Sequence, residues 1–258
     1  MQGEAMSTSA LDLLLLLRGS EPEGLGRADQ VSYQIETAIL MGILTEGDRL
    51  PTESVLAAEF GISPITLRQS LAALRSKGLI ETSRGRSGGS VIRRQIELTD
   101  TQLRDKLRET STEALRDLGD LGAAIASMSA RLAASRADSQ DVEHLEDLVQ
   151  RHQDETDERA RGRMDSRFHV AVSIASQSSR LTAAALQLEA ELMTLRWGHM
   201  GQPGSQGTDV EQHVAIVEAI RARDADAAGS AAERHIRRET EKLIEQHLGL
   251  TMQSEEGA

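Results

Sequence analysis

The stretch from Asp48 to Arg94 constrains the fold of this chain most, because its signals for helix ends follow one another in a fixed order. Thr52 is a good N-cap, with Glu53 in the first turn, and Gly61 can end the helix that begins there. Ser63-Pro64 then opens a second helix, since a proline at the first helical position loses no hydrogen bond. The pattern predicts two short helices joined by a tight turn.

The second helix is expected to face the core through Leu67, Leu71 and Leu74, which recur at helical spacing. That spacing leaves a mainly polar set nearer the outside: Ile65, Thr66, Arg68, Gln69 and Arg75. The first helix is expected to turn three apolar side chains inward: Val55, Leu56 and Phe60. A further helix over residues 29–41 is expected to precede both, with one apolar face formed by Val31, Ile35, Ala38 and Ile39.

A two-stranded hairpin is predicted after the second helix, which Lys77-Gly78 ends. Residues 79–83 and 90–92 read as short strands, and the tip between them is too polar and rich in glycine to belong to a core. Together these elements predict a winged helix-turn-helix over residues 29–95. This unit is built to reach DNA.

Positive charge is concentrated on the same stretch. From Ile62 to Arg94, Glu81 is the one acidic residue, and it stands against seven basic residues: Arg68, Arg75, Lys77, Arg84, Arg86, Arg93 and Arg94. The whole chain carries a formal net charge of −12. Segregated positive charge favours a phosphate-binding face, since phosphate neutralisation supplies much of the affinity for nucleic acid. The alternative is an ordinary solvated basic face.

The chain after residue 100 has the pattern of an all-α bundle. Apolar residues recur at steps of three or four along six predicted helices, marked by Leu115 to Leu132, Val142 to Leu148, Met164 to Ala175, Leu181 to Leu195, Val210 to Ile220 and Asp224 to Leu248. No cysteine is present, which excludes disulfides and thiolate sites. The predicted fold class is mainly α: a winged helix-turn-helix followed by an antiparallel all-α helical bundle over residues 101–249.

The two ends of the chain carry weaker signals. Residues 1–28 are predicted to form an N-terminal extension, partly disordered, and residues 250–258 a disordered tail. The apolar run from Leu11 to Leu17 is too short to span a bilayer, and no Lys or Arg precedes it as in a signal peptide. It is expected to form a short helix that packs on the winged helix or on its own dimer. We expect a cytoplasmic protein with no membrane partner.

Four residues of the predicted bundle could hold a metal ion. Asp165 and His169 are four apart and therefore share one helix face, and His213 and His235 lie on the last two helices, which a short turn makes antiparallel neighbours. A carboxylate with three imidazoles suits zinc, nickel or another borderline divalent ion. By spacing alone, an Asp–His pair is more often a surface hydrogen bond. The other histidines are expected on the surface: His144, His152, His199 and His247.

The landmarks of residues 29–94 resemble the DNA-binding domain of the GntR family of bacterial transcription regulators. They run in order through Gly42 to Glu53 (GILTEGDRLPTE), Phe60 to Ser63 (FGIS), Leu67 to Leu74 and Lys77 to Ile80 (KGLI). The candidate DNA contacts are Thr52, Ser63, Thr66, Arg68, Gln69, Arg84 and Arg86. Of these, Arg68 matches an arginine of the family's recognition helix, while Ser54 and Pro64 occupy positions where the best-known branch has arginines.

The second half resembles the ligand-binding domain of the FadR subfamily, the FCD type, through Asp165-x-x-x-His169, His213 and Arg234-His235. The resemblance implies that these four Asp and His residues hold a divalent metal, and that a small carboxylate or other metabolite is the effector. Conceivable partners for an anionic effector are Arg131, Arg180 and Arg196. The chain departs from the subfamily pattern at two places. Asp117-Leu-Gly119 has glycine where the pattern has arginine, and the turn from Ser176 to Arg180, before the fourth bundle helix, lacks the usual glycine-asparagine.

The mechanism predicted is control of DNA binding by a ligand. A homodimer would present two winged helices to a double-stranded operator, and a small organic acid would bias their spacing. The family resemblance implies a repressor more readily than an activator. Three alternatives stay open at this level. They are a metal-free effector-binding regulator, a metal-dependent enzyme using the same Asp and His cluster, and a winged-helix scaffold that binds a protein.

Overall fold

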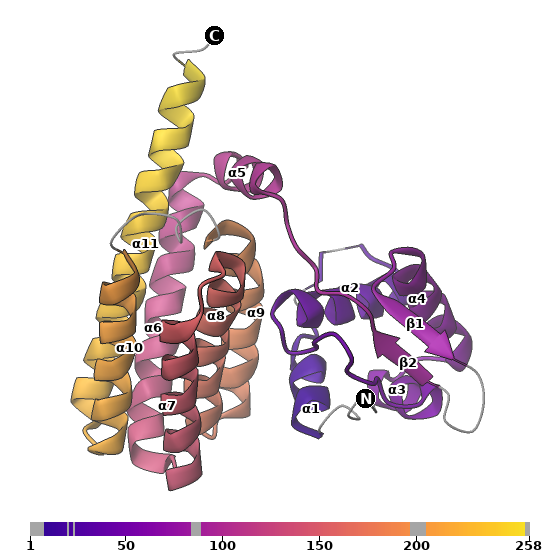
Figure 1. The fold of residues 1–258 in the computed structure, drawn as a ribbon, viewed down its shortest axis with the longest axis horizontal. Coiled ribbons are helices and arrows are strands. Elements are labelled where there is room, and N and C mark those ends of the chain that lie inside the picture. The colour runs from indigo at the N-terminus through magenta and orange to yellow at the C-terminus, as the bar shows by residue number, and fades with distance from the viewer. Residues whose placement is uncertain (1–7, 20, 23, 84–88, 197–204, 256–258) are drawn as a thin grey trace. The chain divides into compact units, whose positions relative to one another are not determined.

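The computed structural model describes residues 8–19, 21–22, 24–83, 89–196 and 205–255. The chain divides into two compact units, residues 1–97 and 98–258, and each is described by itself. The first unit combines helices with one small sheet, and the described elements of the second are all helices (Figure 1). The fold class predicted from the sequence, a winged helix-turn-helix followed by a helical bundle, is confirmed.

The winged unit contains the elements that the sequence predicts, with ends that differ by at most two residues. Its strands pair antiparallel in one register, from Ile80 opposite Ile92 to Ser83 opposite Gly89. An isolated antiparallel bridge between Arg49 and Val91 joins the segment just before the helix at Glu53–Phe60 to the hairpin. The elements are α2 (Arg27–Leu40), α3 (Glu53–Phe60), α4 (Pro64–Ser76), β1 (Ile80–Ser83) and β2 (Gly89–Ile92).

The predicted caps explain why these short helices form. The Thr52 hydroxyl accepts a hydrogen bond from the Val55 N–H, and the Ser63 hydroxyl accepts one from the Thr66 N–H at 3.1 Å. Gly61 ends α3 in the left-handed conformation, with φ of 63°. The prediction for Val55 was wrong, because its side chain is 43% exposed. It lies about 100° around the helix from Leu56, outside the buried stripe of Leu56, Ala57 and Phe60.

The N-terminal apolar run forms α1 (Thr8–Leu16), a helix of the first unit. Leu14 and Leu17 are fully buried, and α1 packs against α2. Beyond the helix, the Arg18 guanidinium lies over the Phe60 ring and donates a hydrogen bond to the Glu59 carbonyl at the end of α3. Of the two roles predicted for this run, packing on the winged helix is the one that this chain shows.

The second unit is a bundle built around α6. This helix packs against α8, α9, α10 and α11, and Figure 1 shows these helices running alongside one another. Small residues make up much of the buried surface of α6, so that its neighbours approach closely. The described helices are α5 (Asp100–Glu109), α6 (Thr112–Arg136), α7 (Ser139–Asp154), α8 (Glu158–Ala175), α9 (Ser179–Arg196), α10 (Ser205–Arg221) and α11 (Ala225–Glu255).

The bundle differs from the sequence prediction at three places. Helix α5 was not predicted, because it buries only Leu103 and Leu107 and its remaining residues are mostly polar. Helix α10 begins at Ser205, five residues before the predicted start. Helix α11 continues to Glu255, so residues 250–255 are helical and not part of a disordered tail. No helix of the described ranges has both the length and the apolar character needed to cross a membrane.

Gly119 explains one departure from the subfamily signature. A Cβ atom at this position of α6 would overlap the side chain of Thr240 on α11, and the arginine that the signature expects there would overlap it further. A Cβ atom at Gly122, one turn later, would be tight but less crowded, at 3.1 Å from Ile236 of α11 and 3.3 Å from Leu188 of α9. Glycine at these positions therefore sets how closely α6 approaches its neighbours.

Gly119→Ala is expected to destabilise the protein by about 1–3 kcal/mol, because the added methyl group overpacks the contact with Thr240. Urea unfolding followed by circular dichroism measures the change. Gly249→Ala is the matched control, since nothing lies within 4 Å of a Cβ there; it should stabilise α11 by about 0.5–1 kcal/mol. Equal stability changes for the two variants would contradict the close contact between α6 and α11.

Candidate functional site

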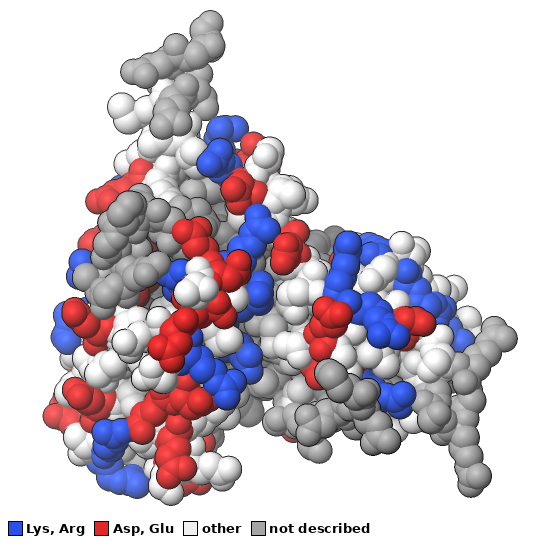
Figure 2. All heavy atoms as spheres, in the orientation of Figure 1, with Lys and Arg blue, Asp and Glu red and all other residues white. Residues whose placement is uncertain are grey.

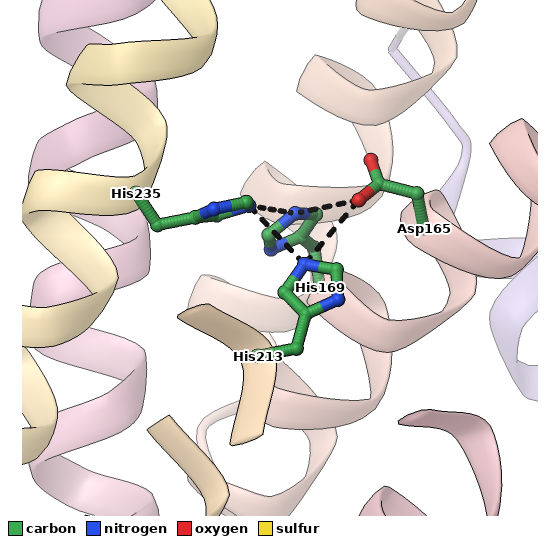
Figure 3. Close-up of side chains that lie close together, drawn as sticks. All are labelled: Asp165, His169, His213 and His235. Carbon is green, nitrogen blue, oxygen red and sulfur yellow. Dashed lines mark hydrogen bonds and ion pairs between the residues drawn. The ribbon is translucent and has the colours of Figure 1, made fainter. Parts of the chain in front are cut away.

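The bundle brings together the four residues predicted as metal ligands. Asp165 and His169 lie one turn apart on α8, His213 comes from α10 and His235 from α11, and one ligand atom of each lies within 4.8 Å of the others (Figure 3). The Nε2 atom of His213 is 3.3 Å from Oδ1 of Asp165 and 3.2 Å from Nε2 of His235. The Nε2 atom of His169 is 3.2 Å from that of His235. Three imidazole nitrogens and one carboxylate oxygen therefore converge on one point.

Neighbouring side chains fix the orientation of the imidazoles. The Nδ1 atom of His235 lies 3.0 Å from Oε1 of Gln212. Because an amide oxygen only accepts, this contact places the proton on Nδ1 and leaves the lone pair of Nε2 for an ion. The Phe168 ring stacks on His213, with ring centroids 4.1 Å apart. Gln212 thus belongs to the site, although no motif in the sequence marks it.

The electrostatics of the cluster suit a cation. Burial works to raise the pKa of Asp165, but His169 and His213 hold it well below its usual range. Burial lowers the pKa of His213 to about 4, although its hydrogen bond with Asp165 opposes part of this shift. At neutral pH the cluster therefore offers a carboxylate and a neutral His213 imidazole. These are the protonation states in which both groups bind metals.

The metal-free protein is expected to lose stability as the pH falls from about 6.5 to 4. The unfolded chain protonates His213 in this range while the folded chain does not, so stability present above the unfolded pKa is lost. The His213 contribution amounts to about 3 kcal/mol. Urea unfolding of chelator-treated wild type and His213→Gln measures it, because the variant lacks the titrating group. The same loss of stability in both proteins would contradict the prediction. Asp165 does not interfere, because its pKa is held well below the usual range and it is protonated only at still lower pH.

Three charged residues lie one or two turns from the histidines of the cluster on α10 and α11: Asp209, Glu239 and Lys242. Asp209 lies one turn before His213, and Glu239 lies one turn after His235. The Lys242 ammonium joins them, at 2.7 Å from Asp209 and 2.8 Å from Glu239. Burial, with Asp165 and Asp209 nearby, raises the pKa of Glu239. The i±4 spacing from the two histidines is the sequence signal that could have identified Asp209 and Glu239.

Two histidines predicted on the surface are buried. His152 shares the inward face of α7 with Leu145, Leu148 and Val149, and its ring centroid is 5.3 Å from that of His213. Burial lowers the pKa of His152. His247 follows Leu243 by one turn on α11, and its Nδ1 atom is 3.0 Å from the carbonyl oxygen of Leu107. His144 is exposed as predicted, and His199 lies outside the described residues.

A cavity adjoins the metal cluster, with His169 in its wall. Helices α6, α8, α9, α10 and α11 contribute to it, and most of its lining is apolar or glycine. Besides His169, Ser129 of α6 and Glu189 of α9 supply its polar side chains, and the larger apolar residues are Ile125, Phe168, Val172, Leu188, Ile216 and Ile236. The position of this cavity allows a small ligand to reach both an ion at the cluster and the helices around it.

Two of the three arginines proposed as effector partners, Arg131 and Arg180, are not among the described residues that line this cavity. Arg131 pairs with Asp226 and covers Gly229, away from the cavity lining. Arg180 is exposed in the first turn of α9. The Arg196 side chain lies outside the described residues. Helix periodicity could not distinguish these positions from inward ones.

The predicted DNA-binding residues lie on the outer side of α3 and α4. Thr52 and Ser63 cap these helices, and the Ser63 and Thr66 hydroxyls lie 2.9 Å apart. Arg68 and Gln69 are exposed; the Arg68 Nε donates to the Pro64 carbonyl at 3.2 Å and lies 3.7 Å from Glu53. On the face drawn in Figure 2, basic groups gather on the winged unit. Arg84 and Arg86 lie outside the described residues.

Comparisons with known proteins agree with both halves of the molecule. The profile of the bacterial regulatory proteins of the gntR family matches residues 27–89, and that of the FCD domain matches residues 117–238. The chain is similar to RmpR of Mycobacterium gastri, an HTH-type transcriptional regulator by its name, with 34% identity over 87% of this chain and 82% of the relative.

Two further relatives come from Escherichia coli K12. The galactonate operon transcriptional repressor is 28% identical over 86% of this chain and 98% of its own length. The Glc operon transcriptional activator is 29% identical over 80% of this chain and 85% of its own length. Among solved structures, E. coli McbR/YncC shares the fold, with a TM-score of 0.53 and 17% identity over 86% of this chain and 99% of that one. The chain belongs to the GntR family of bacterial regulatory proteins, in the FadR-like subfamily with an FCD domain.

Proposed function

We propose that this DNA-binding transcription regulator responds to a small carboxylate bound at a divalent metal ion in its FCD domain. The observation that carries the proposal is the convergence of Asp165, His169, His213 and His235 beside a cavity. The family and the named relatives are regulators, which disfavours the metal-dependent enzyme considered from the sequence. We also expect the protein to work in the cytoplasm, as a repressor.

Zinc or nickel suits the donor set best. Three imidazole nitrogens and one carboxylate oxygen suit a borderline divalent ion, and Asp165, His169, His213 and His235 would hold it. A bound ion supplies a Lewis acid that attracts a carboxylate oxygen of the effector. Galactonate, the compound in the name of one relative's operon, is a carboxylate of this general class. The protein's own contribution is to fix the four ligands and to enclose the rest of the effector.

Operator recognition is assigned to the winged unit. A homodimer would place the α4 helices in the major grooves of two half-sites related by a two-fold axis, with Thr66, Arg68 and Gln69 near the bases. Thr52 and Ser63 would lie near phosphates, together with Arg84 and Arg86 of the hairpin tip. The effector would shift the equilibrium between two arrangements of the winged units by its difference in affinity for them.

The FCD domain is the proposed dimer contact, because α6 exposes an apolar stripe. Leu121 and Met128 lie seven residues apart on one helix face and are 52% and 47% exposed. Leu121→Glu is expected to weaken the dimer about 100-fold, since it places a charge where two symmetric copies would bury leucine. Sedimentation velocity over a concentration series measures this change. Val55→Glu is the control, because Val55 is also an exposed apolar residue, at 43%, but lies in the other unit. A Leu121→Glu protein that dimerises as tightly as the wild type would contradict the assignment.

The experiment that tests the proposed function measures operator affinity by fluorescence anisotropy. A DNA fragment selected by the wild-type protein would be titrated with metal-loaded and chelator-treated protein, each with and without a panel of small acids. We expect an acid to change the affinity about 10-fold or more only when metal is present. A response that persists after chelation would favour a metal-free effector site, and no response to any acid would contradict the proposal.

A further inference from the structure

The cavity beside the metal cluster contains polar groups that metal binding does not use. Its wall includes His169, so that a ligand in the cavity can lie next to the cluster. Ser129 of α6 and Glu189 of α9 also line it, and they are 1% and 3% exposed. Neither belongs to the set of four ligand residues. Two buried polar side chains in a mostly apolar cavity require an explanation.

The hydrogen bonds of these two residues indicate what they can accept. The Ser129 hydroxyl has no hydrogen-bond partner among the described residues. Leaving a buried hydroxyl without a hydrogen bond is unfavourable, and most such groups in proteins are paired. The Glu189 carboxylate accepts a hydrogen bond from the Ser166 hydroxyl at 3.0 Å, which fixes it against α8. A carboxylate has room for several hydrogen bonds, so Glu189 can accept another from a ligand.

A ligand with a purely hydrocarbon chain in this cavity could form a hydrogen bond with neither Ser129 nor Glu189. It would remove water from Ser129 and Glu189 without replacing the lost hydrogen bonds. A ligand with a hydroxyl or ammonium group can instead donate to Glu189, and a hydroxyl can also pair with Ser129. Sites with buried polar groups of this kind reject analogues that lack the matching group far more strongly than apolar pockets reject a missing methylene.

We propose that Ser129 and Glu189 form a specificity subsite for a hydrogen-bond donor on the effector. The effector would then be a short carboxylate that carries a hydroxyl or ammonium group, with its acid group toward the metal cluster and its donor toward α6 and α9. This inference rests on the proposed function, because it assumes that an acid binds at the metal. It adds that unsubstituted short fatty acids are excluded.

Isothermal titration calorimetry of zinc-loaded full-length protein tests the subsite with three acids of equal chain length: propionate, lactate and alanine. Lactate supplies a hydroxyl and alanine an ammonium group, whereas propionate supplies neither, and both enantiomers of each substituted acid are used. We expect at least one donor-bearing acid to bind about 10-fold or more tightly than propionate. The acid that binds most tightly shows whether the subsite prefers a hydroxyl or an ammonium donor.

The preference should depend on the two subsite residues. Ser129→Ala and Glu189→Gln are each expected to reduce it to about 3-fold or less. The controls carry the same changes on the same helices outside the cavity: Ser135→Ala, whose hydroxyl bonds the Arg131 carbonyl, and Glu191→Gln, which is exposed. Thermal unfolding confirms that each variant folds.

The outcomes separate the subsite from the function on which it rests. Propionate binding as tightly as lactate and alanine would overturn the subsite and leave a metal-bound carboxylate intact. A preference that survives in both Ser129→Ala and Glu189→Gln would also overturn it. If none of the acids binds the zinc-loaded wild type, both the subsite and the carboxylate effector are wrong.

Discussion

Replacing His213 by alanine is expected to weaken zinc binding by more than about 100-fold, since substitutions of groups outside the ligand set already cost 10–100-fold. His213 is fully buried, and its Nε2 atom lies close to both Asp165 and His235, so that its loss leaves a gap at the centre of the cluster. Competition with a chromophoric chelator measures the affinity. His144→Ala removes an exposed histidine and serves as the control.

The same variant should separate effector sensing by the helical bundle from DNA binding by the winged unit. His213→Ala is expected to keep its operator affinity without effector, because the winged unit folds around its own core, but to lose the response to acids. Unchanged zinc affinity in His213→Ala would contradict the metal site itself. Loss of operator binding in the absence of any effector would contradict the assignment of His213 to the sensing half.

Replacing Arg68 by alanine is expected to reduce operator affinity by about 100-fold or more in a dimer. One specific arginine contact contributes about 1–3 kcal/mol, and a two-fold operator would lose it at both half-sites. Arg68 is available for this role because its ion pair with Glu53 is long, at 3.7 Å, and exposed, and such pairs contribute little to stability. Fluorescence anisotropy at one fixed salt concentration gives the comparison.

Arg108→Ala provides the matched control for Arg68. Arg108 is also an exposed helix arginine with a nearby carboxylate, Asp105 at 3.2 Å, but it lies on α5. It should leave operator affinity within about 2-fold of the wild type. Equal affinities for Arg68→Ala and wild type would show that α4 does not carry the specific contact.

The winged unit was predictable from sequence because local signals specify it. Caps at Thr52 and Ser63, the proline at position 64 and the left-handed Gly61 each act over three or four residues, and all agree with the structure. Val55 was misplaced because an eight-residue helix offers too few apolar positions to define its buried stripe. Helix α5 was missed for a related reason, since it depends on contacts with α9 and α11 that leave little periodicity in its own sequence.

The candidate site was predictable only in part. Spacing placed Asp165 and His169 on one face and His213 and His235 on neighbouring helices, which allowed a metal site, and the resemblance to a known family strengthened this prediction. The periodicity of α7 places His152 on one face with Leu145, Leu148 and Val149, so its burial could have been predicted from the sequence. Ser129 and Glu189 could not have been identified, because their meeting in one cavity depends on how α6 and α9 pack in three dimensions.

Native mass spectrometry with elemental analysis of the full-length protein, purified without added metal, tests the central claim most directly. The claim is that the chain is a dimeric regulator whose sensing half is built around a metal ion. The account predicts a mass of two chains with one divalent ion per chain, zinc or nickel by elemental analysis. A metal-free monomer would contradict it.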